Sequence, residues 1–392
     1  MWFLVVFFLV YWLMHIVVFG LSGLQLGFSA RAWSAALPLT LFLSLTPLWA
    51  ALVPDWLPRW ALTSIWWATY IWLGVLFYLF CVQTVYAVGW VALHWGPASL
   101  QSVFAPRAAW FWAGVALVCL VLAYGVYEAR ERFDVTRHEI PLAQAAAPLR
   151  LVFFSDLHLG LMPSFGRLEE LVRLCERIEP DLVCIGGDLL NDHTGFLERE
   201  LDLVRRLSRQ FPVWAVLGNH EVYSGVDASL AFYEQAGVRV LQNASRLLNP
   251  STPLRVTGVN DPALGQRSLS ARLSPALAEA SDNPGEDVVH ILLSHSPRGW
   301  PDDVPEDVDL MLSGHTHRGQ MFPFSWVVRL AYPHINGIYS EGSRHLIVSR
   351  GAGTWGPPFR VLAPPEALVL DILPTAEAAG GTDGKAPASY GQ

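Results

Sequence analysis

Apolar residues are spread unevenly along the chain, and the pattern changes at about Tyr127. Four almost uninterrupted apolar stretches precede this point: Trp2–Phe19, Ala36–Val53, Leu62–Val91 and Ala108–Tyr127. A bilayer hydrocarbon core about 30 Å thick requires roughly 20 helical residues to cross it. Segments rich in glycine and proline separate the stretches, as is typical of turns. We therefore expect residues 1–127 to form a transmembrane domain of about four helices.

A different pattern begins near Leu149, where short β-branched runs alternate with amphipathic segments. The runs predict strands at Arg150–Phe154, Leu182–Ile185, Val213–Leu217, Arg255–Val259, His290–Leu293, Val308–Leu312, His345–Ser349 and Ala367–Leu370. Apolar residues at i, i+3 and i+4 predict surface helices at Arg167–Glu179 and Phe196–Arg209. This alternation indicates an α/β domain whose helices cover the faces of sheets.

The same pattern suggests where the domains begin and end. The charged segment 128–148 is expected to be a juxtamembrane linker, and residues 149–373 the folded domain. Residues 374–392 consist largely of Ala, Gly, Thr, Pro and Ser, which bury too little surface to fold, so a disordered tail is expected there.

Composition supports the division of the chain into two parts. Hydrophobic residues make up 53% of the 392 residues and charged residues only 15%. The charged residues that precede Glu128 are Arg31, Asp55, Arg59 and Arg107. The formal net charge is −8, and no basic stripe is present, which argues against a nucleic-acid partner. No protein partner is indicated either, whereas the apolar stretches imply a lipid bilayer.

The few charged residues near the apolar stretches predict an orientation. With four crossings, Arg59 and the arginines at 130, 132 and 137 would share the side of the C-terminal domain, opposite Arg31 and Arg107. The positive-inside rule then places that domain in the cytoplasm. A fifth crossing within Leu62–Val91 would reverse this orientation. The first stretch lacks a preceding basic residue and a cleavage site, so it is expected to be retained.

Polar side chains follow five of the predicted strands at the point where each strand ends. They are Asp156 and His158, then Asp188, then Asn219 and His220, then His295, and finally His315 and His317. Ligands of open α/β sheets bind at the carboxyl ends of the strands, so these side chains are expected to converge on one rim.

The residue types at this rim indicate a metal site. Setting His220 aside, two aspartates, one asparagine and four histidines supply the oxygen and imidazole donors that first-row divalent ions prefer, and no thiolate is among them. Seven donors exceed the needs of one ion. They suit two ions about 3.5–4 Å apart that share a bridging carboxylate. Each motif alone is weak evidence for a metal site, but the occurrence of all of them in this order, each after a predicted strand, is strong evidence.

The series of motifs resembles the calcineurin-like metallophosphoesterase superfamily over about Leu149 to Leu373. The resemblance rests on Asp156-x-His158, Gly187-Asp188, Gly218-Asn219-His220-Glu221, His295 and Gly314-His315-x-His317. The apolar stretches, Leu293-Ser-His-Ser-Pro297 and Ser349-Arg-Gly-Ala-Gly353 further resemble its bacterial membrane-linked branch, which includes phosphodiesterases and lipid-precursor diphosphatases. The resemblance implies a four-layer sandwich of two mixed β-sheets flanked by helices, located at the bacterial inner membrane.

The resemblance also implies a role for each residue of the rim. The first metal receives Asp156, His158 and His317, the second receives Asn219, His295 and His315, and Asp188 bridges the two. A hydroxide activated by the ions would attack phosphorus, and His220 would donate a proton to the leaving oxygen. The two divalent ions are expected to be Mn, Fe or Zn.

Two positions depart from the family pattern. Members often carry Gly-Asp-x-x-Asp, whose second Asp orients the proton-donating histidine, whereas here Asn191 occupies that position and Asp192 follows it. Whether Asn191 or Asp192 supports His220 is left open. Arg318 follows His317 where the family favours glycine; its guanidinium could bind a substrate phosphate or pair with a surface carboxylate.

These observations predict a membrane-bound phosphoesterase with two metal ions that hydrolyses a phosphodiester or diphosphate bond. A lipid or a lipid-linked nucleotide is the candidate substrate. The alternative is a membrane sensor or scaffold with a catalytically idle metal-binding domain. A transporter lacks support, because no apolar stretch carries the buried carboxylate expected of a substrate path.

Overall fold

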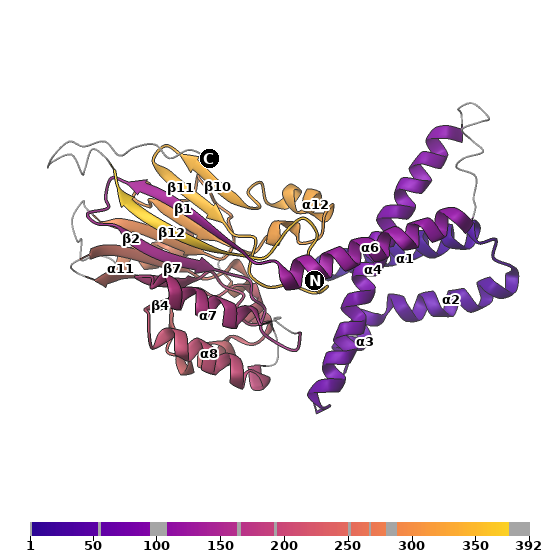
Figure 1. Ribbon diagram of the computed structural model, residues 1–392, viewed down its shortest axis with the longest axis horizontal. Helices are drawn as coiled ribbons and strands as arrows, with labels where there is room; N and C mark the ends of the chain where they lie inside the picture. Colours follow the sequence, from indigo (N-terminus) through magenta and orange to yellow (C-terminus); the bar gives the residue numbers. More distant parts are fainter. Residues whose placement is uncertain are drawn as a thin grey trace. The chain divides into compact units, whose positions relative to one another are not determined.

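The computed structural model describes residues 2–53, 56–94, 108–162, 166–191, 194–249, 252–265, 268–279 and 288–375. The chain folds into two compact units (Figure 1). The first consists of residues 1–127 together with 356–361, and the second of residues 128–355 and 362–392.

The first unit is helical. Its helices are α1 (Trp2–Gln25), α2 (Ala30–Ser44), α3 (Thr46–Ala51), α4 (Arg59–His94) and α6 (Ala108–Glu131), the last of which runs into the second unit. Within the described residues, three segments are long and apolar enough to cross a bilayer: Val5–Gln25, Arg59–Leu93 and Ala108–Glu131. The helix α4 is continuous over the predicted stretch Leu62–Val91, which therefore counts as one candidate span.

The predicted second span, Ala36–Val53, falls on two short helices. This stretch is divided at Leu45 into α2, with 15 residues, and α3, with 6. Pro47 lies in the first turn of α3 and has no N–H group to donate to the Leu43 carbonyl of the preceding turn, so the helical hydrogen-bond pattern is interrupted there. Neither helix reaches the roughly 20 residues that a crossing requires. By length and composition, the described residues therefore provide three candidate spans, and the predicted count of about four stays a prediction.

Paired polar groups join the helices of the first unit. The Tyr11 hydroxyl lies 2.9 Å from Thr46 Oγ1, and Gln83 Nε2 donates to Gln25 Oε1 at 2.9 Å. Such bonds between apolar helices satisfy groups that hydrocarbon would leave unpaired. The segment 356–361 also packs here, since Arg360 N donates to the Gly125 carbonyl at 3.0 Å.

The second unit contains two six-stranded sheets. The first has the order β1-β12-β2-β3-β4-β5 and the second β10-β11-β9-β8-β7-β6. The strands of the first are β1 (Asp134–Leu142), β12 (Glu366–Pro374), β2 (Leu149–Phe154), β3 (Leu182–Ile185), β4 (Val213–Ala215) and β5 (Arg239–Val240). Those of the second are β10 (Gly337–Glu341), β11 (Arg344–Val348), β9 (Leu310–Ser313), β8 (Val289–Ser294), β7 (Thr252–Val259) and β6 (Ala244–Asn249). β2, β3 and β4 are mutually parallel, as are β7, β8 and β9.

The sheets stack face to face with helices outside them. Leu151 and Phe153 of β2 face the second sheet, whereas Val152 and Phe154 pack against helices, as the two-residue period of a strand requires. The helices α7 (Arg167–Ile178), α8 (Glu198–Ser208) and α10 (Val226–Gln235) cover the first sheet. The helix α11 (Leu269–Glu279) covers the second. This arrangement confirms the predicted four-layer sandwich (Figure 1).

All eight predicted strands are present, but the expected linker 128–148 contains an unpredicted one. β1 occupies Asp134–Leu142 and pairs in parallel with β12, from Asp134 opposite Glu366 to Leu142 opposite Pro374. It is an edge strand with alternating exposed residues, which explains its polar composition. Only two residues separate α6 from β1. The expected tail, 374–392, lies outside the described residues from position 376 onward.

Candidate metal centre

The polar residues that follow the strands come together where the carboxyl ends of both sheets meet. Asp156 N donates to the Gly187 carbonyl at 3.0 Å, which joins the segments that leave β2 and β3. His315 N, just beyond β9, donates to the Asp156 carboxylate at 3.0 Å and links the second sheet to the first. Residues that follow strands of both sheets therefore build the predicted rim.

The donor atoms form three overlapping groups, and within each group they lie within 4.8 Å of one another. Asp156, His158 and His317 make the first, and Asp188, His295 and His315 make the second. The third joins these two, because it consists of His158, Asp188 and His220. In the first group, His158 Nε2 lies 3.0 Å from His317 Nε2, which lies 3.4 Å from Asp156 Oδ1. In the second, His295 Nε2 lies 3.1 Å from both Asp188 Oδ2 and His315 Nδ1.

Asp188 lies between the first two groups. Its Oδ2 atom is 3.1 Å from His295 Nε2 and 4.0 Å from His158 Nε2. This is the position that a bridging carboxylate would occupy. The first two groups contain histidine and aspartate residues that the family resemblance assigns to the two metals, and the role of each residue as a ligand remains a prediction.

The local chemistry fits divalent cations. Among the described residues, the buried Asn219 Oδ1 has no hydrogen-bond partner, and an unpaired buried acceptor typically costs about 1–3 kcal/mol. A bound cation would satisfy it. A Cβ atom on Gly218 would lie 2.1 Å from Asp188 Oδ1, and one on Gly314 would lie 2.2 Å from Asp156 Oδ2. Glycine at these positions therefore leaves the carboxylates room beside the backbone.

Most of the candidate ligands have a backbone conformation that is rare for residues other than glycine. Left-handed φ angles are found at Asp156 (56°), His158 (53°), Asp188 (51°), His315 (70°) and His317 (47°). A non-glycine residue in this conformation costs roughly 1–3 kcal/mol, and such residues cluster at functional sites. The turns direct the side chains inward as soon as each strand ends. This concentration of strain supports a functional role for the rim.

Burial and mutual contact set the ionisation of the cluster. Burial lowers the pKa of His158 well below its usual value, and it lowers that of His315 to about 4, with a further contribution from His295. Burial raises the pKa of Asp188, but the surrounding histidines, His295 foremost, together lower it by more, so the carboxylate is ionised. Neutral imidazoles and ionised carboxylates are the forms that bind metal ions.

His295 differs from the other histidines. Burial lowers its pKa, but the attraction of nearby carboxylates, Asp188 foremost, together outweighs burial and raises the pKa well above its usual value. The proton between His295 and Asp188 must leave before a cation can bind both, so metal binding is coupled to proton release.

Sequence reasoning assigned no role to Glu221, which the structure places at the centre of the loops. Its fully buried carboxylate accepts hydrogen bonds from Gly218 N at 2.7 Å, Asp188 N at 2.9 Å and Leu190 N at 3.0 Å. The Tyr233 hydroxyl donates to it at 3.2 Å. Burial, with Asp188 nearby, raises the pKa of Glu221 to about 7. Its position directly after Asn219 and His220 was the available signal.

His220 lies beside the first group. Its ring centroid is 4.5 Å from that of His158, and the rings of Tyr223 and Trp355 flank it at 5.2 and 6.1 Å. Asp192 lies outside the described residues, so the choice between it and Asn191 as the support of His220 stays open.

Arg318 is half-buried directly after His317. Both roles considered for its guanidinium, a substrate phosphate or a surface carboxylate, stay open.

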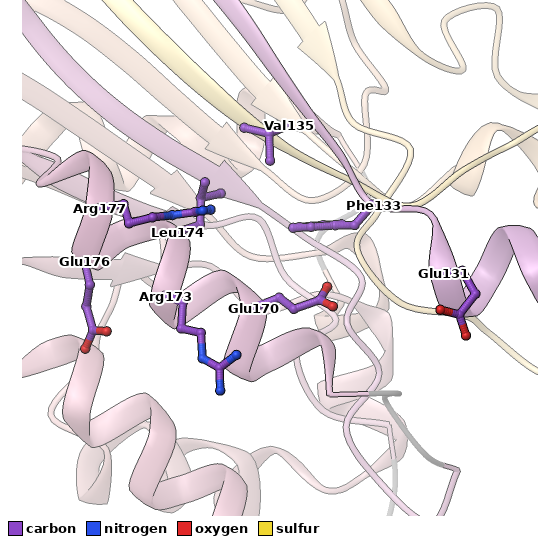
Figure 2. Close-up of a pocket in the computed structure, with 8 residues that line it drawn as sticks. All are labelled: Glu131, Phe133, Val135, Glu170, Arg173, Leu174, Glu176 and Arg177. Carbon is purple, nitrogen blue, oxygen red and sulfur yellow. The ribbon is translucent and has the colours of Figure 1, made fainter.

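A cavity of about 620 Å³ lies apart from this centre, beside α7 and β1 (Figure 2). It is lined by Glu131, Phe133, Val135, Glu170, Arg173, Leu174, Glu176 and Arg177. None of the candidate ligands lines it. The chemistry of the strand ends therefore points to the metal centre and not to this cavity.

Comparison with known proteins agrees with the geometry. Residues 149–319 match the family of calcineurin-like phosphoesterases. A metallophosphoesterase of Helicobacter pylori is 32% identical over 256 residues, which are 65% of this chain and 68% of that protein. A Danio rerio protein named transmembrane protein with metallophosphoesterase domain is 27% identical over 62% of this chain and 59% of its own length. Phosphodiesterase YaeI of Escherichia coli is 28% identical over 62% of this chain and 88% of its own length.

The close approach at Gly218 yields a first prediction. In Gly218→Ala, the new methyl group displaces the Asp188 carboxylate, and metal affinity should fall by about 10–100-fold, as it does when the support of a ligand is disturbed. Metal per chain after dialysis, measured by mass spectrometry, checks this. Gly195→Ala is the control, because a Cβ atom there meets nothing within 4 Å. Equal metal content in both variants would contradict the prediction.

A second prediction concerns Glu221. In Glu221→Gln, an amide N–H₂ group replaces one of the oxygens that accept backbone N–H groups, and it leaves at least one buried donor unpaired, at a cost of about 1–3 kcal/mol. The Tm of the purified protein should fall by several degrees. The control is Glu234→Gln, at an exposed position of α10. An unchanged Tm in Glu221→Gln would show that the loops do not depend on this carboxylate.

Proposed function

The chain belongs to the calcineurin-like metallophosphoesterase family, and from this premise we propose that it is a membrane-anchored phosphoesterase that uses two divalent cations to hydrolyse a phosphodiester or diphosphate bond. The observation that carries the proposal is the set of overlapping, largely buried donor groups around Asp188. Asp156, His158 and His317 hold the first cation in this proposal, Asn219, His295 and His315 hold the second, and Asp188 holds both. Mn, Fe and Zn all suit such a donor set.

Bound cations would polarise the phosphoryl group and lower the pKa of a coordinated water. The chain itself supplies the remaining chemistry. His220 is placed at the rim to donate a proton to the leaving oxygen, a step worth typically about 10²–10⁴-fold. Burial lowers the pKa of His220, so its imidazolium is a stronger acid. Arg318, beside His317, would bind a phosphate oxygen.

The proposed substrate is a lipid or a lipid-linked nucleotide. Three candidate spans attach the enzyme to a bilayer. Tyr223 and Trp355 flank His220 and are 69% and 45% exposed, so they offer apolar ring faces to a substrate beside the metal centre. A small, fully hydrated phosphate ester would gain little from either feature.

Hydrolysis of bis(p-nitrophenyl) phosphate by the detergent-solubilised chain tests the activity. We expect turnover that depends on added Mn²⁺, disappears with EDTA and returns with metal. Asp188→Asn should lower the rate by at least about 10³-fold, because cation stabilisation of the transition state is worth several kcal/mol. Asp202→Asn is the control, since that side chain is 75% exposed on α8.

Two outcomes would overturn the proposal. Robust turnover by Asp188→Asn would exclude the bridging role. Stoichiometric metal binding without hydrolysis of any substrate, across a panel of cyclic nucleotides and UDP-linked acyl sugars, would instead identify an idle metal domain that serves as a sensor or scaffold.

We also propose that the metal centre faces the cytoplasm. With three crossings, Arg31, Arg59 and the arginines at 130, 132 and 137 lie on the side of the second unit, and Arg107 lies opposite. The positive-inside rule then favours the cytoplasm more strongly than a four-crossing arrangement does.

Carboxyl-terminal fusions expressed in Escherichia coli test this orientation. A green fluorescent protein fusion should fluoresce, whereas an alkaline phosphatase fusion should be inactive, because the first folds in the cytoplasm and the second requires the periplasm. A dark fluorescent fusion together with an active phosphatase fusion would place the domain on the other side.

A further inference from the structure

The helix α12 (Phe324–Ala331) is attached directly to the metal centre. It follows the turn η3 (His317–Gly319), which carries a candidate ligand. Just beyond its end, the Tyr332 hydroxyl lies 2.7 Å from His315 Nε2, and the Ile335 carbonyl accepts from Thr316 Oγ1 at 2.6 Å. The helix is therefore held at both ends by the loop that bears His315 and His317.

The outer face of α12 is apolar and uncovered. Leu330 is 88% exposed, Trp326 64% and Val327 54%. At 100° per residue these side chains form one continuous arc, while Ser325 and Val328 on the other side are half-buried. Phe322 and Phe324 extend the exposed arc at the start of the helix. Soluble proteins rarely leave a contiguous apolar patch of this kind in water.

The charge around α12 indicates what covers this face. No Asp or Glu occurs between Asp309 and Glu341, although the chain has 34 acidic residues and a net charge of −8. The same stretch contains Arg318 and Arg329. An apolar face with tryptophan, arginine at its border and no carboxylates suits an anionic lipid surface, which attracts basic groups and repels acidic ones.

A bilayer is also close to this unit. The last candidate span ends at Glu131, and β1 begins at Asp134. Two residues reach at most about 7 Å, so the unit that carries α12 cannot move far from the membrane that the span crosses.

From these observations we propose that α12 lies in the headgroup region of the bilayer, with Trp326, Val327 and Leu330 inserted and Arg329 near the lipid phosphates. The helix would thereby hold the metal centre against the lipid surface. This inference rests on the membrane location in the proposed function and not on hydrolysis. A second copy of the chain and another protein are the competing occupants of the face.

Fluorescence of the full chain in vesicles tests the inference. We would label Leu330→Cys with bimane, in a chain carrying Cys81→Ser and Cys119→Ser, and reconstitute it in phosphatidylcholine and phosphatidylglycerol (3:1). Leu247→Cys is the matched control, because Leu247 is an apolar residue of β6 that is 40% exposed. Val327→Cys provides a second position on the α12 face in case Leu330→Cys does not fold.

The labels on α12 should show blue-shifted emission that nitroxide-bearing lipids reduce at least about twofold, as expected for side chains about 5–10 Å inside the interface. The control label should respond to aqueous iodide instead. Iodide quenching of the α12 labels equal to that of the control would overturn the inference. Blue-shifted emission without nitroxide quenching would also overturn it, because protein would then cover the face. Neither readout needs activity, so failure of the proposed hydrolysis is separately detectable.

Discussion

The loops of the metal centre depend on one buried carboxylate, that of Glu221. It accepts the backbone N–H groups of Asp188, Leu190 and Gly218, which belong to the segments that leave two neighbouring parallel strands. Without this acceptor, three donors would remain unpaired in the interior, where each typically costs about 1–3 kcal/mol. Because those segments carry Asp188, Asn219 and His220, the position of the bridging donor and of the proposed acid follows from a residue that is not itself a candidate ligand.

The same loops hold carboxylates close to the backbone and keep several candidate ligands in a strained backbone conformation. Asp156 and Asp188 can lie against the backbone only because glycine occupies positions 314 and 218. Five candidate ligands hold left-handed backbone, and the hydrogen bonds between the strand ends keep them there. The folded chain thus bears the cost of bringing carboxylates and imidazoles together before any ligand arrives, as a preorganised site requires. The favourable interactions that offset this cost come from the two-sheet core behind the rim.

The sequence was informative where structure is local. Each candidate ligand directly follows an apolar strand, so five strand ends and the donors beyond them could be predicted from short segments. β1 could not, because its alternating polar residues are stabilised by pairing with β12, more than 200 residues away. The role of Glu221 also depends on the tertiary structure, since its partners come from three separate places in the chain. The break at Pro47 was a local signal, but the high hydrophobicity of its surroundings concealed it.

The two kinds of apolar helix in this chain would serve different purposes at a membrane. The candidate spans of α1, α4 and α6 have enough apolar residues to cross a bilayer and would supply the anchoring free energy. The eight residues of α12 extend only about 12 Å and cannot cross one. An interfacial helix on an already anchored protein contributes orientation rather than affinity. Hydrogen bonds join the segment after α12 to the loop of His315 and His317. The orientation proposed for α12 at the bilayer would therefore also set the orientation of the metal centre. A substrate phosphate at the headgroup level would then reach the ions without leaving the bilayer.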